Sequence, residues 1–482
     1  MFYREGGNLK MLLYTLLFIL IAILIFLYFF LKKDIAQPSI IFIASYVISV
    51  GCCIFNIERW NVNFRLNTFI IFLLGTIEFV GICIIIHYIF ENRKNNYKNN
   101  QENENNDKPI NNKKIRKIPI YICVLSIIYC IAALIIRFTM ILNVAKMFGE
   151  FSNFSEALTI FKANTSYTKN YEIPHFYNLI SKPIIILAYV FLYYFIKRVT
   201  YSDENKLKVV LKNFYYLIPS LTYMVFEFIS SNRLSIISLI IAAIIIGLMM
   251  YQEKNNKVIE KNKILTLLVM GIIGFFIFYA SASFIGRKNT NNFFRYITLY
   301  CGGSIECFNR YLQDDRMEES NNILGEETFY YLIDNVNHYL HTDIKIPKVI
   351  HLEFRYNDDI MIGNVYTAYR RWYSDFGILG IVLLNGLMAG IYQSFYEIIR
   401  KKINDKKNID LLLIIYSYIA FPIFLHPIDS YYTLLIFRLT FITTLFLFFI
   451  LYYSIKNTDL YFENKKIKII FKDKNLLKND RE

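Results

Sequence analysis

Apolar residues in this 482-residue chain occur in long, nearly uninterrupted blocks that are separated by polar segments. A bilayer core of ~30 Å is crossed by about 20 apolar residues in a helix, so blocks of roughly 17 to 25 residues are the units to count. Eleven such blocks are present, at residues 11–31, 38–56, 67–90, 118–142, 177–196, 213–229, 234–251, 264–285, 374–397, 409–425 and 430–453. The pattern therefore predicts an all-α, polytopic integral membrane protein with about 11 transmembrane helices.

The composition points in the same direction as the block pattern. Hydrophobic residues make up 55% of the chain and charged residues only 19%, whereas soluble globular proteins carry about 25% charged residues. A soluble enzyme of several domains is therefore excluded. The first block begins at Met11 and has no small-residue cleavage site after it, so we expect a retained span and not a signal peptide.

The distribution of basic residues predicts how the spans are oriented. The chain holds 53 Lys and Arg against 38 Asp and Glu, a net charge of +15. Alternate loops and the C-terminal tail carry 32 of these basic residues, and the opposite loops carry only eight outside one long loop. Because cytoplasmic loops are enriched in Lys and Arg, we expect the N-terminus outside and the C-terminus in the cytoplasm. Basic charge in this arrangement reports topology and does not indicate a nucleic-acid partner.

The order of spans and loops divides the chain into four parts. Residues 1–285 hold the first eight spans and a segment at 91–117 of mainly Asn, Lys and Glu, which we expect to be a disordered cytoplasmic linker. An extracytoplasmic loop at 286–372 is 87 residues long and rich in Phe, Tyr, Ile and Leu. Long loops without structure are uncommon, so this loop is expected to fold against the outer ends of the spans. Residues 373–454 hold the last three spans, and residues 455–482 form a basic cytoplasmic tail.

The long loop differs from the cytoplasmic loops in its type of basic residue. Arginine supplies seven of its ten basic residues: Arg287, Arg295, Arg310, Arg316, Arg355, Arg370 and Arg371. The planar guanidinium binds phosphate in a bidentate manner and stays charged when partly dehydrated. Twelve Asp and Glu residues in the same loop bring its net charge close to zero. We therefore expect individual arginine sites and not a non-specific polyanion surface.

Five charged residues inside predicted spans need a physical explanation: Glu78, Arg137, Lys182, Glu227 and Arg438. Each costs ~2.5 to 3.5 kcal/mol on insertion scales. Arg137 and Lys182 are near the outer ends of their spans, where snorkelling can satisfy them. Arg438 lies eight residues past Ser430, which places it ~12 Å into the membrane at ~1.5 Å per residue. Glu78 and Glu227 are candidate partners of Arg438 or Arg137, and a structural ion pair explains these charges as well as a catalytic role does.

Two segments at the outer membrane boundary carry candidate chemistry. Arg233 lies in the tight turn 230–233 between two spans, at the depth of a lipid headgroup. The segment 363–377 contains Tyr366, Tyr369, Arg370, Arg371, Trp372, Tyr373 and Asp375. An aromatic belt with a helix cap at Asp375 explains this composition, and it is the simpler interpretation for Trp372 and Tyr373. An acid four or five residues from two arginines is alternatively a base beside a phosphate site.

Histidine and cysteine spacings predict no metal site. His338 and His341 are three residues apart, which alone only weakly indicates zinc. His426 lies in a short outer turn together with Asp429, so it is a candidate member of the outer site. Cys301 and Cys307 are both expected outside the membrane, where they form either a disulfide or two thiols. The chain has no P-loop, GxSxG or strand-linked GxGxxG motif, so neither a metal nor another cofactor is expected.

Four short segments together resemble a known family. They are Ser230-Ser231-Asn232-Arg233, Gly286-Arg287, Tyr300-Cys301-Gly302-Gly303-Ser304-Ile305, and the block that runs from Asn364-Val365-Tyr366-Thr367 to Tyr373-Ser374-Asp375-Phe376-Gly377. With these segments the chain resembles bacterial oligosaccharide repeat-unit polymerases of the O-antigen polymerase (Wzy-type) class. The resemblance covers roughly residues 214–400 in motifs and the whole chain in topology. The sequence has no second obvious Arg-x10-Gly arrangement of the kind found in some members.

The resemblance implies a metal-independent glycosyl transfer at the outer leaflet of the bacterial plasma (inner) membrane. A growing glycan on undecaprenyl diphosphate would be moved onto the newest lipid-linked repeat unit, which yields a surface polysaccharide of the O-antigen or capsule type. The partners would be undecaprenyl-diphosphate-linked glycans and membrane lipids, together with a flippase and a chain-length regulator.

The resemblance also implies roles for individual residues of this chain. Diphosphate binding falls to Arg233, Arg287 and Arg371, with Arg370 and Arg438 as further members. Asp375 would be the general base, with His426 or His351 as the alternative. Sugar rings would stack on Tyr366, Tyr369, Trp372 and Tyr373.

Other functions would use a different part of these features. A ligase that passes finished glycan to another acceptor needs the same arginine-rich outer site. A flippase for lipid-linked oligosaccharides predicts internal repeats and charges near the bilayer midplane, whereas the sequence shows no internal repeat and its informative charges gather on the outer side. A structural or scaffolding membrane protein would need neither the arginines nor a folded loop.

Overall fold

The computed structural model describes residues 2–99, 117–168, 170–230, 232–255, 271, 274, 276, 279–280, 292–314, 323–345, 352–463 and 466–471. These residues are mostly helical, and the long apolar helices among them are those of a multi-pass membrane protein. Most of the predicted span at 264–285 and most of the predicted linker at 91–117 fall outside the described residues. Arg287 and His351, which both have a predicted role in the site, also fall outside the described residues.

The first part of the chain contains α1 (Phe2–Phe30), α2 (Pro38–Ile54), α3 (Leu66–Asn99), α4 (Ile120–Phe148), α5 (Phe154–Lys162), the π-helical turn η1 (Ala163–Tyr167), α6 (His175–Tyr201), α7 (Lys206–Lys212), the 3-10 turn η2 (Phe214–Leu217), α8 (Ile218–Ile229) and α9 (Arg233–Asn255). The second part contains α11 (Phe293–Tyr311), α12 (Tyr330–Leu340), β1 (Arg355–Asn357), β2 (Ile360–Gly363), α13 (Tyr369–Asn404), α14 (Asp410–Ile419), α15 (Phe421–Leu425), α16 (Tyr431–Ile436), α17 (Leu439–Asn457), β3 (Thr458–Glu463) and β4 (Lys466–Phe471). The strands form two separate antiparallel hairpins, β1–β2 and β3–β4.

Seven of the described helices are long and apolar enough to cross a membrane, and α7 with η2–α8 adds an eighth if this bent pair is one span. The seven are α1, α3, α4, α6, α9, α13 and α17, and each coincides with a predicted block. The predicted spans at 38–56 and 409–425 are shorter in the structure. The latter changes from α14 to α15 at Ala420, because the following Pro422 has no N–H to continue the helix.

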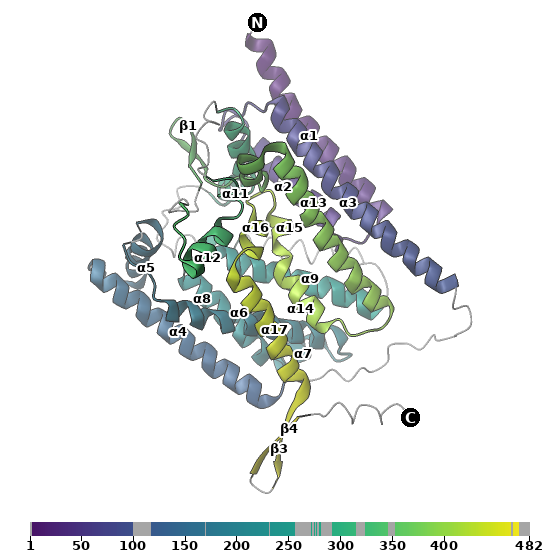
Figure 1. Ribbon diagram of the computed structural model, residues 1–482, viewed down its shortest axis with the longest axis vertical. Coiled ribbons are helices and arrows are strands. Elements are labelled where there is room, and N and C mark those ends of the chain that lie inside the picture. Colours follow the sequence, from purple (N-terminus) through teal and green to yellow (C-terminus); the bar gives the residue numbers. More distant parts are fainter. Residues whose placement is uncertain are drawn as a thin grey trace.

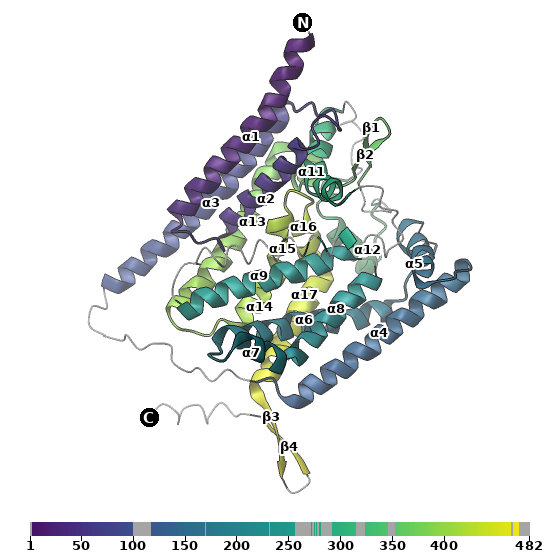
Figure 2. The same ribbon diagram turned by 180° about the vertical axis from the view of Figure 1, so that it is seen from behind.

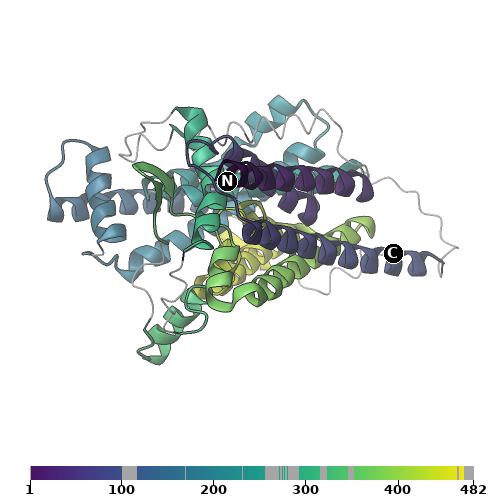
Figure 3. The same cartoon turned by 90° about the horizontal axis from the view of Figure 1, so that it is seen from above.

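The two ends of the helical bundle carry different elements. Helix α1 begins at the end where α11 and the β1–β2 hairpin lie, which we call the loop end (Figure 1). The β3–β4 hairpin projects from the opposite end, which we call the tail end, and the view from behind shows the same separation (Figure 2). Seen from above, α4 and α5 lie on the side of the bundle away from α1 and α3 (Figure 3). This arrangement places the folded part of the long loop against one end of the helices.

Two consecutive glycines set the position of α11. A Cβ atom on Gly302 would lie 2.4 Å from the backbone nitrogen of Cys53, and one on Gly303 would lie 2.6 Å from the carbonyl oxygen of Ile362. Helix α11 therefore approaches α2 on one side and β2 on the other at backbone distance. The same helix carries Cys301 and Cys307, which are both buried free thiols. The structure has two thiols here and not a disulfide, and Sγ of Cys307 donates to the carbonyl oxygen of Gly363 at 3.6 Å.

The close approach of α11 predicts the effect of adding one methyl group. Gly302→Ala should lower the free energy of unfolding by about 1–3 kcal/mol, because the neighbouring atoms are backbone and cannot rotate away. Thermal unfolding in detergent measures the change. Gly390→Ala is the matched control, since a Cβ there meets nothing within 4 Å and Ala favours the helix. An equal shift of both variants would contradict the proposed contact.

Candidate functional site

The N-terminal turn of α13 brings two arginines and an acid to the loop end. Arg370 and Arg371 are 6% and 3% exposed, and Asp375 is 7% exposed. Glu327, from the loop before α12, and Asp429, from the turn after α15, complete this group, which we call the arginine–carboxylate cluster. Three predicted site residues, which are neighbours in α13, are thus joined by the fold to two acids that were not predicted as site residues.

Arg370 is held from two directions. Its Nη1 donates to Oε1 and Oε2 of Glu327 at 3.1 and 2.9 Å. Its guanidinium also lies 3.6 Å from the centre of the Tyr311 ring, at the last residue of α11. Planar stacking on an aromatic ring leaves the edge of the guanidinium free to form hydrogen bonds. The side chain is therefore positioned before any substrate binds.

Arg371 reaches a different carboxylate. Its Nε donates to Oδ1 of Asp429 at 3.1 Å. Asp429 comes from the turn that sequence analysis associated with His426, so the two predicted outer segments do meet. The buried charge of Arg371 is thereby compensated by an acid from a segment almost 60 residues away in the chain.

Asp375 anchors the loop before α12. Its carboxylate accepts the backbone N–H of Thr328 at 2.7 Å and that of Glu327 at 3.4 Å. The hydroxyl of Thr328 in turn donates to the carbonyl oxygen of Arg371 at 3.3 Å. These hydrogen bonds tie the loop before α12 to the start of α13. This position makes Asp375 a positioning residue for Glu327 in the structure.

Glu327 is the acid that sequence analysis missed. Burial raises the pKa of Glu327 above its usual value of 4.5, although Arg370 and Arg371 act to lower it. Ser374 donates to its Oε1 at 3.2 Å. A carboxylate with a raised pKa is a better proton acceptor at neutral pH than an ordinary one. Its sequence context, one of 12 acids in the long loop, gives no sign of this environment.

Arg233 lies at the other end of α11. It donates to the hydroxyls of Tyr296 and Tyr300. The turn that carries it also receives Arg137 of α4, whose Nε donates to Oγ of Ser230 at 3.0 Å. Glu227 accepts from Nδ2 of Asn232 at 2.7 Å, and the structure shows no ion pair between these two described residues, Glu227 and Arg137. Two arginines therefore border the α8–α9 turn.

Arg438 lies in the break between α16 and α17 and is exposed. Its guanidinium is 3.8 Å from the centre of the Tyr331 ring in α12, and it donates to the Tyr331 hydroxyl. The expectation of an arginine ~12 Å along a continuous span is wrong, because the helix begins only at Leu439. The predicted pairing with Glu78 is also wrong, since Glu78 accepts from Asn385 instead.

His426 is enclosed by aromatic rings. Its Nδ1 is 2.8 Å from the Tyr46 hydroxyl, and the rings of Phe42, Tyr369 and Trp372 lie around it. Burial lowers the pKa of His426 to about 3, so the imidazole is neutral. A base must reach the proton that it removes, and the 1% exposure of His426 does not fit such a role in this conformation.

The predicted sugar-stacking residues are mostly part of the core. Tyr366, Tyr369 and Trp372 are each 0% exposed, so they offer no ring face to a sugar in this conformation. Tyr373 is half-buried against the rings of Phe308 and Tyr311. The aromatic residues of this segment therefore hold the start of α13 in place.

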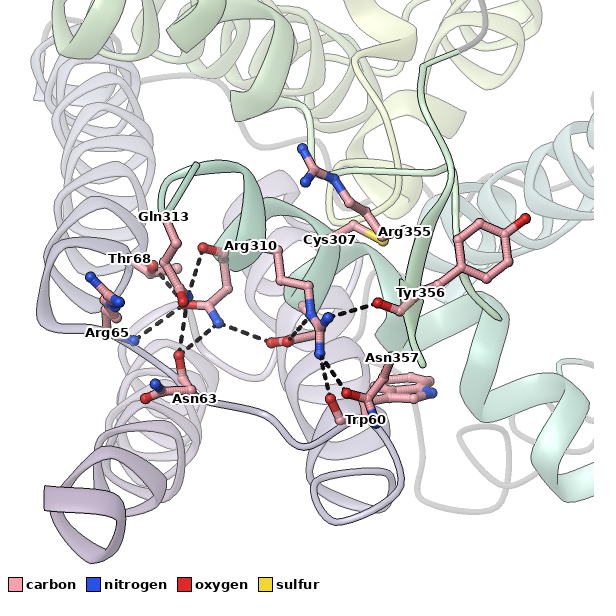
Figure 4. Close-up of polar contacts among 12 residues, drawn as sticks. Trp60, Asn63, Arg65, Thr68, Cys307, Arg310, Gln313, Arg355, Tyr356 and Asn357 are labelled. Atoms are coloured by element: carbon pink, nitrogen blue, oxygen red, sulfur yellow. Dashed lines mark hydrogen bonds and ion pairs between the residues drawn. The ribbon is translucent and has the colours of Figure 1, made fainter. Parts of the chain in front are cut away.

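Arg310 joins three segments of the loop end (Figure 4). It donates to Glu306 in α11 at 2.7 Å, to the carbonyl oxygen of Trp60 at 2.6 Å and to that of Tyr356 in β1 at 2.8 Å. The α2–α3 loop, α11 and the β1–β2 hairpin are thereby fixed to one another. The role of this arginine is structural, although sequence analysis counted it with the phosphate-binding type.

A second polar network lies at the tail end. Asp34 is 4% exposed and accepts from Gln252 at 2.6 Å and from Tyr396 at 2.6 Å. Glu397 accepts from His87 at 2.7 Å and from Gln393 at 2.9 Å. These contacts join the α1–α2 turn to α3, α9 and α13. This network was not predictable from the sequence, because its members are single polar residues at the ends of different helices.

Within the described residues, no group of three or more His, Cys, Asp or Glu side chains is arranged to hold a metal ion. Comparisons with protein-family models, with curated proteins and with solved structures found no match to this chain.

The contacts of Asp375 predict a loss of stability on substitution. Asp375→Asn should lower the free energy of unfolding by about 1–3 kcal/mol, because an amide N–H would replace an acceptor that faces backbone N–H groups. Thermal unfolding and limited proteolysis near residues 323–329 measure the change. Asp343→Asn is the control, since Asp343 is exposed. Normal stability with lost turnover would return Asp375 to the role of general base.

Proposed function

We propose that this protein polymerises undecaprenyl-diphosphate-linked oligosaccharide repeat units into a surface polysaccharide of the O-antigen or capsule type. The reaction takes place at the outer leaflet of the bacterial plasma membrane and uses no metal ion. The observation that supports this proposal best is the gathering of the buried Arg370 and Arg371 with the half-buried Glu327 at the loop end. Such a group offers charge stabilisation for a leaving diphosphate and a base for an attacking hydroxyl.

In the proposed glycosyl transfer, one bond breaks, one bond forms and one proton moves to the protein. The bond between C1 of the growing glycan and the diphosphate oxygen breaks, and the undecaprenyl diphosphate leaves with the electron pair. A bond forms between C1 and a hydroxyl oxygen of the acceptor unit, and the hydroxyl proton passes to Glu327. Arg370 and Arg371 stabilise the charge that develops on the leaving group. Glu327 takes the role first assigned to Asp375, whose carboxylate accepts backbone N–H groups.

Arg233 binds a second diphosphate in this proposal. Tyr300, which contacts Arg233, and Tyr311, which stacks on Arg370, are 11 residues apart on α11. This spacing corresponds to about 16 Å along the helix axis. A diphosphate bonded to the reacting carbon cannot be that far from the base. The acceptor's own diphosphate is separated from its attacking hydroxyl by the length of the repeat unit, so it is the one that suits Arg233.

The orientation of the chain is part of the proposal. We place the loop end outside and the tail end in the cytoplasm, with eleven spans, an external N-terminus and a cytoplasmic C-terminal tail. The Lys-rich segments support this orientation. The start of α1 and the β3–β4 hairpin lie at opposite ends of the bundle (Figure 1), as an odd number of spans requires.

The alternative functions make different demands on this architecture. A ligase would use the same cluster with another acceptor. A flippase would have to open the tail end, where Asp34 and Glu397 bind side chains from α3, α9 and α13. In the proposed function, a separate flippase and a chain-length regulator are partners of this protein. Polymerase, ligase and flippase activity of this chain predict different accumulated intermediates.

In cells that lack this protein, single lipid-linked repeat units should accumulate on the outer leaflet, because flipping continues when polymerisation stops. Mass spectrometry with an impermeant labelling reagent measures the species and its leaflet. Arg233→Ala should lower polymer formation by about 100-fold at normal membrane abundance. The exposed Arg65→Ala should restore wild-type polymer. Single units trapped inside would indicate a flippase, and full-length lipid-linked polymer would indicate a ligase.

The proposed base predicts a pH profile. Glu327→Gln should lower turnover of purified lipid-linked units in nanodiscs by about 100-fold or more. Wild-type turnover should fall as the pH drops through the raised pKa of Glu327, because only the ionised carboxylate accepts a proton. The residual turnover of the variant should not change over that range. Asp334→Asn, at an exposed position of α12, should keep the wild-type profile. Wild-type turnover in Glu327→Gln would place the base elsewhere.

A further inference from the structure

One face of the β1–β2 hairpin exposes three large apolar side chains. Phe354, Tyr356 and Met361 are 52%, 50% and 43% exposed. Tyr356 pairs with Met361 across the hairpin, and the ring centres of Phe354 and Tyr356 are 6.4 Å apart with 38° between their planes. We call these three residues the aromatic face. Adjacent exposed apolar side chains on a folded surface mark an interaction site.

The opposite face holds the hairpin in place. Arg310 donates to the carbonyl oxygen of Tyr356 at 2.8 Å, and Nδ2 of Asn357 donates to the carbonyl oxygen of Arg59 at 3.2 Å. Ile362 is buried beside Gly303 of α11. In Figure 4 the ring of Tyr356 points away from these anchoring contacts. The aromatic face is therefore fixed before a ligand arrives, which lowers the entropic cost of binding.

A short chain of charges connects this face to the arginine–carboxylate cluster. Arg355 of β1 donates to Oε1 of Glu353 at 2.9 Å, and Oε2 of Glu353 is 3.8 Å from Arg370. Glu353 directly precedes Phe354 in the chain. A glycan that extends from the arginine–carboxylate cluster past Glu353 therefore reaches the aromatic face.

The charges around the aromatic face select its ligand. Asp358 and Asp359 form the exposed turn of the hairpin, and Glu353 is exposed on the other side. The carboxylates of Asp358 and Asp359 repel phosphate headgroups, whereas the charge of Glu353 is compensated by Arg355 and Arg370, so this face does not fit an anionic membrane surface. A sugar ring carries C–H groups on its faces and hydroxyls on its rim. Aromatic rings pack against the first, and carboxylates accept hydrogen bonds from the second.

We infer that the aromatic face is a saccharide-binding site that holds the growing glycan between successive transfers. The identity of the saccharide rests on the proposed function, whereas the chemistry of transfer does not require this site. Loss of the aromatic face therefore shortens the polymer and leaves transfer itself in place.

Chain length in cells is the first test. Phe354→Ala combined with Tyr356→Ala should still form polymer, but with a modal length at most half that of the wild type on a gel of the surface polysaccharide. Tyr356→Phe keeps the ring and should keep the length. Tyr339→Ala is the matched control, because Tyr339 is 56% exposed on α12 and lies outside the hairpin. Unchanged length in the double variant would overturn the inference.

Direct binding is the second test. The probe is surface polysaccharide released from wild-type cells by mild acid, bound to the full-length protein in nanodiscs. Each lost ring should weaken binding by about threefold to tenfold. Unchanged binding with shorter chains, together with loss of a co-purified protein, would make the face a protein-docking surface and would overturn the inference. Polymer that persists in cells lacking the chain would instead refute the proposed function, whatever the binding result.

Discussion

Two adjacent buried guanidinium groups at the start of α13 dominate the loop end. Arginine does not lose its proton in proteins, and a buried charge without a partner is strongly unfavourable. Arg370 and Arg371 therefore need carboxylates, which come from the loop before α12 and from the turn after α15. Asp375 fixes the first of these segments by its backbone. The folded loop and the bundle are consequently parts of one structure, because the charges of each are satisfied by the other.

The sequence predicted the helical membrane architecture well where hydrophobicity alone determines structure. The blocks that became α1 and α3 are long continuous helices, whereas α13 has a kink at Gly377, where φ is 61° and ψ is −149°. Hydrophobicity does not report breaks within a block, so the division at Ala420 and the late start of α17 were missed. Arg438 was placed in the membrane for the same reason. Its exposed position against Tyr331 depends on a helix break that apolar residues on both sides conceal.

The arginines of the candidate site could be predicted from the sequence, but the carboxylates that bind them could not. The arginines of the long loop stand out because the other loops carry mainly lysine. Which of the 12 acids of the loop pairs with Arg370 depends on the fold, and in the structure it is Glu327. Aromatic residues gave no reliable signal either. Tyr366 and Trp372 are core residues, whereas Phe354 and Tyr356 are exposed at the β1–β2 hairpin. The chemistry of these side chains is the same, so only burial separates a packing role from a binding role.

Helix α11 gives the proposed reaction a fixed geometry. Gly302 and Gly303 hold it against α2 and β2 at backbone distance, so the helix cannot slide or rotate without a steric clash. Its tyrosines contact Arg233 near one end and Arg370 at the other. If these arginines bind the acceptor and donor diphosphates, an acceptor must span about 16 Å between its diphosphate and its attacking hydroxyl. A longer repeat unit can bend to meet this distance, but a shorter one cannot stretch to it. The packing of one helix would then set the smallest repeat unit that the protein accepts.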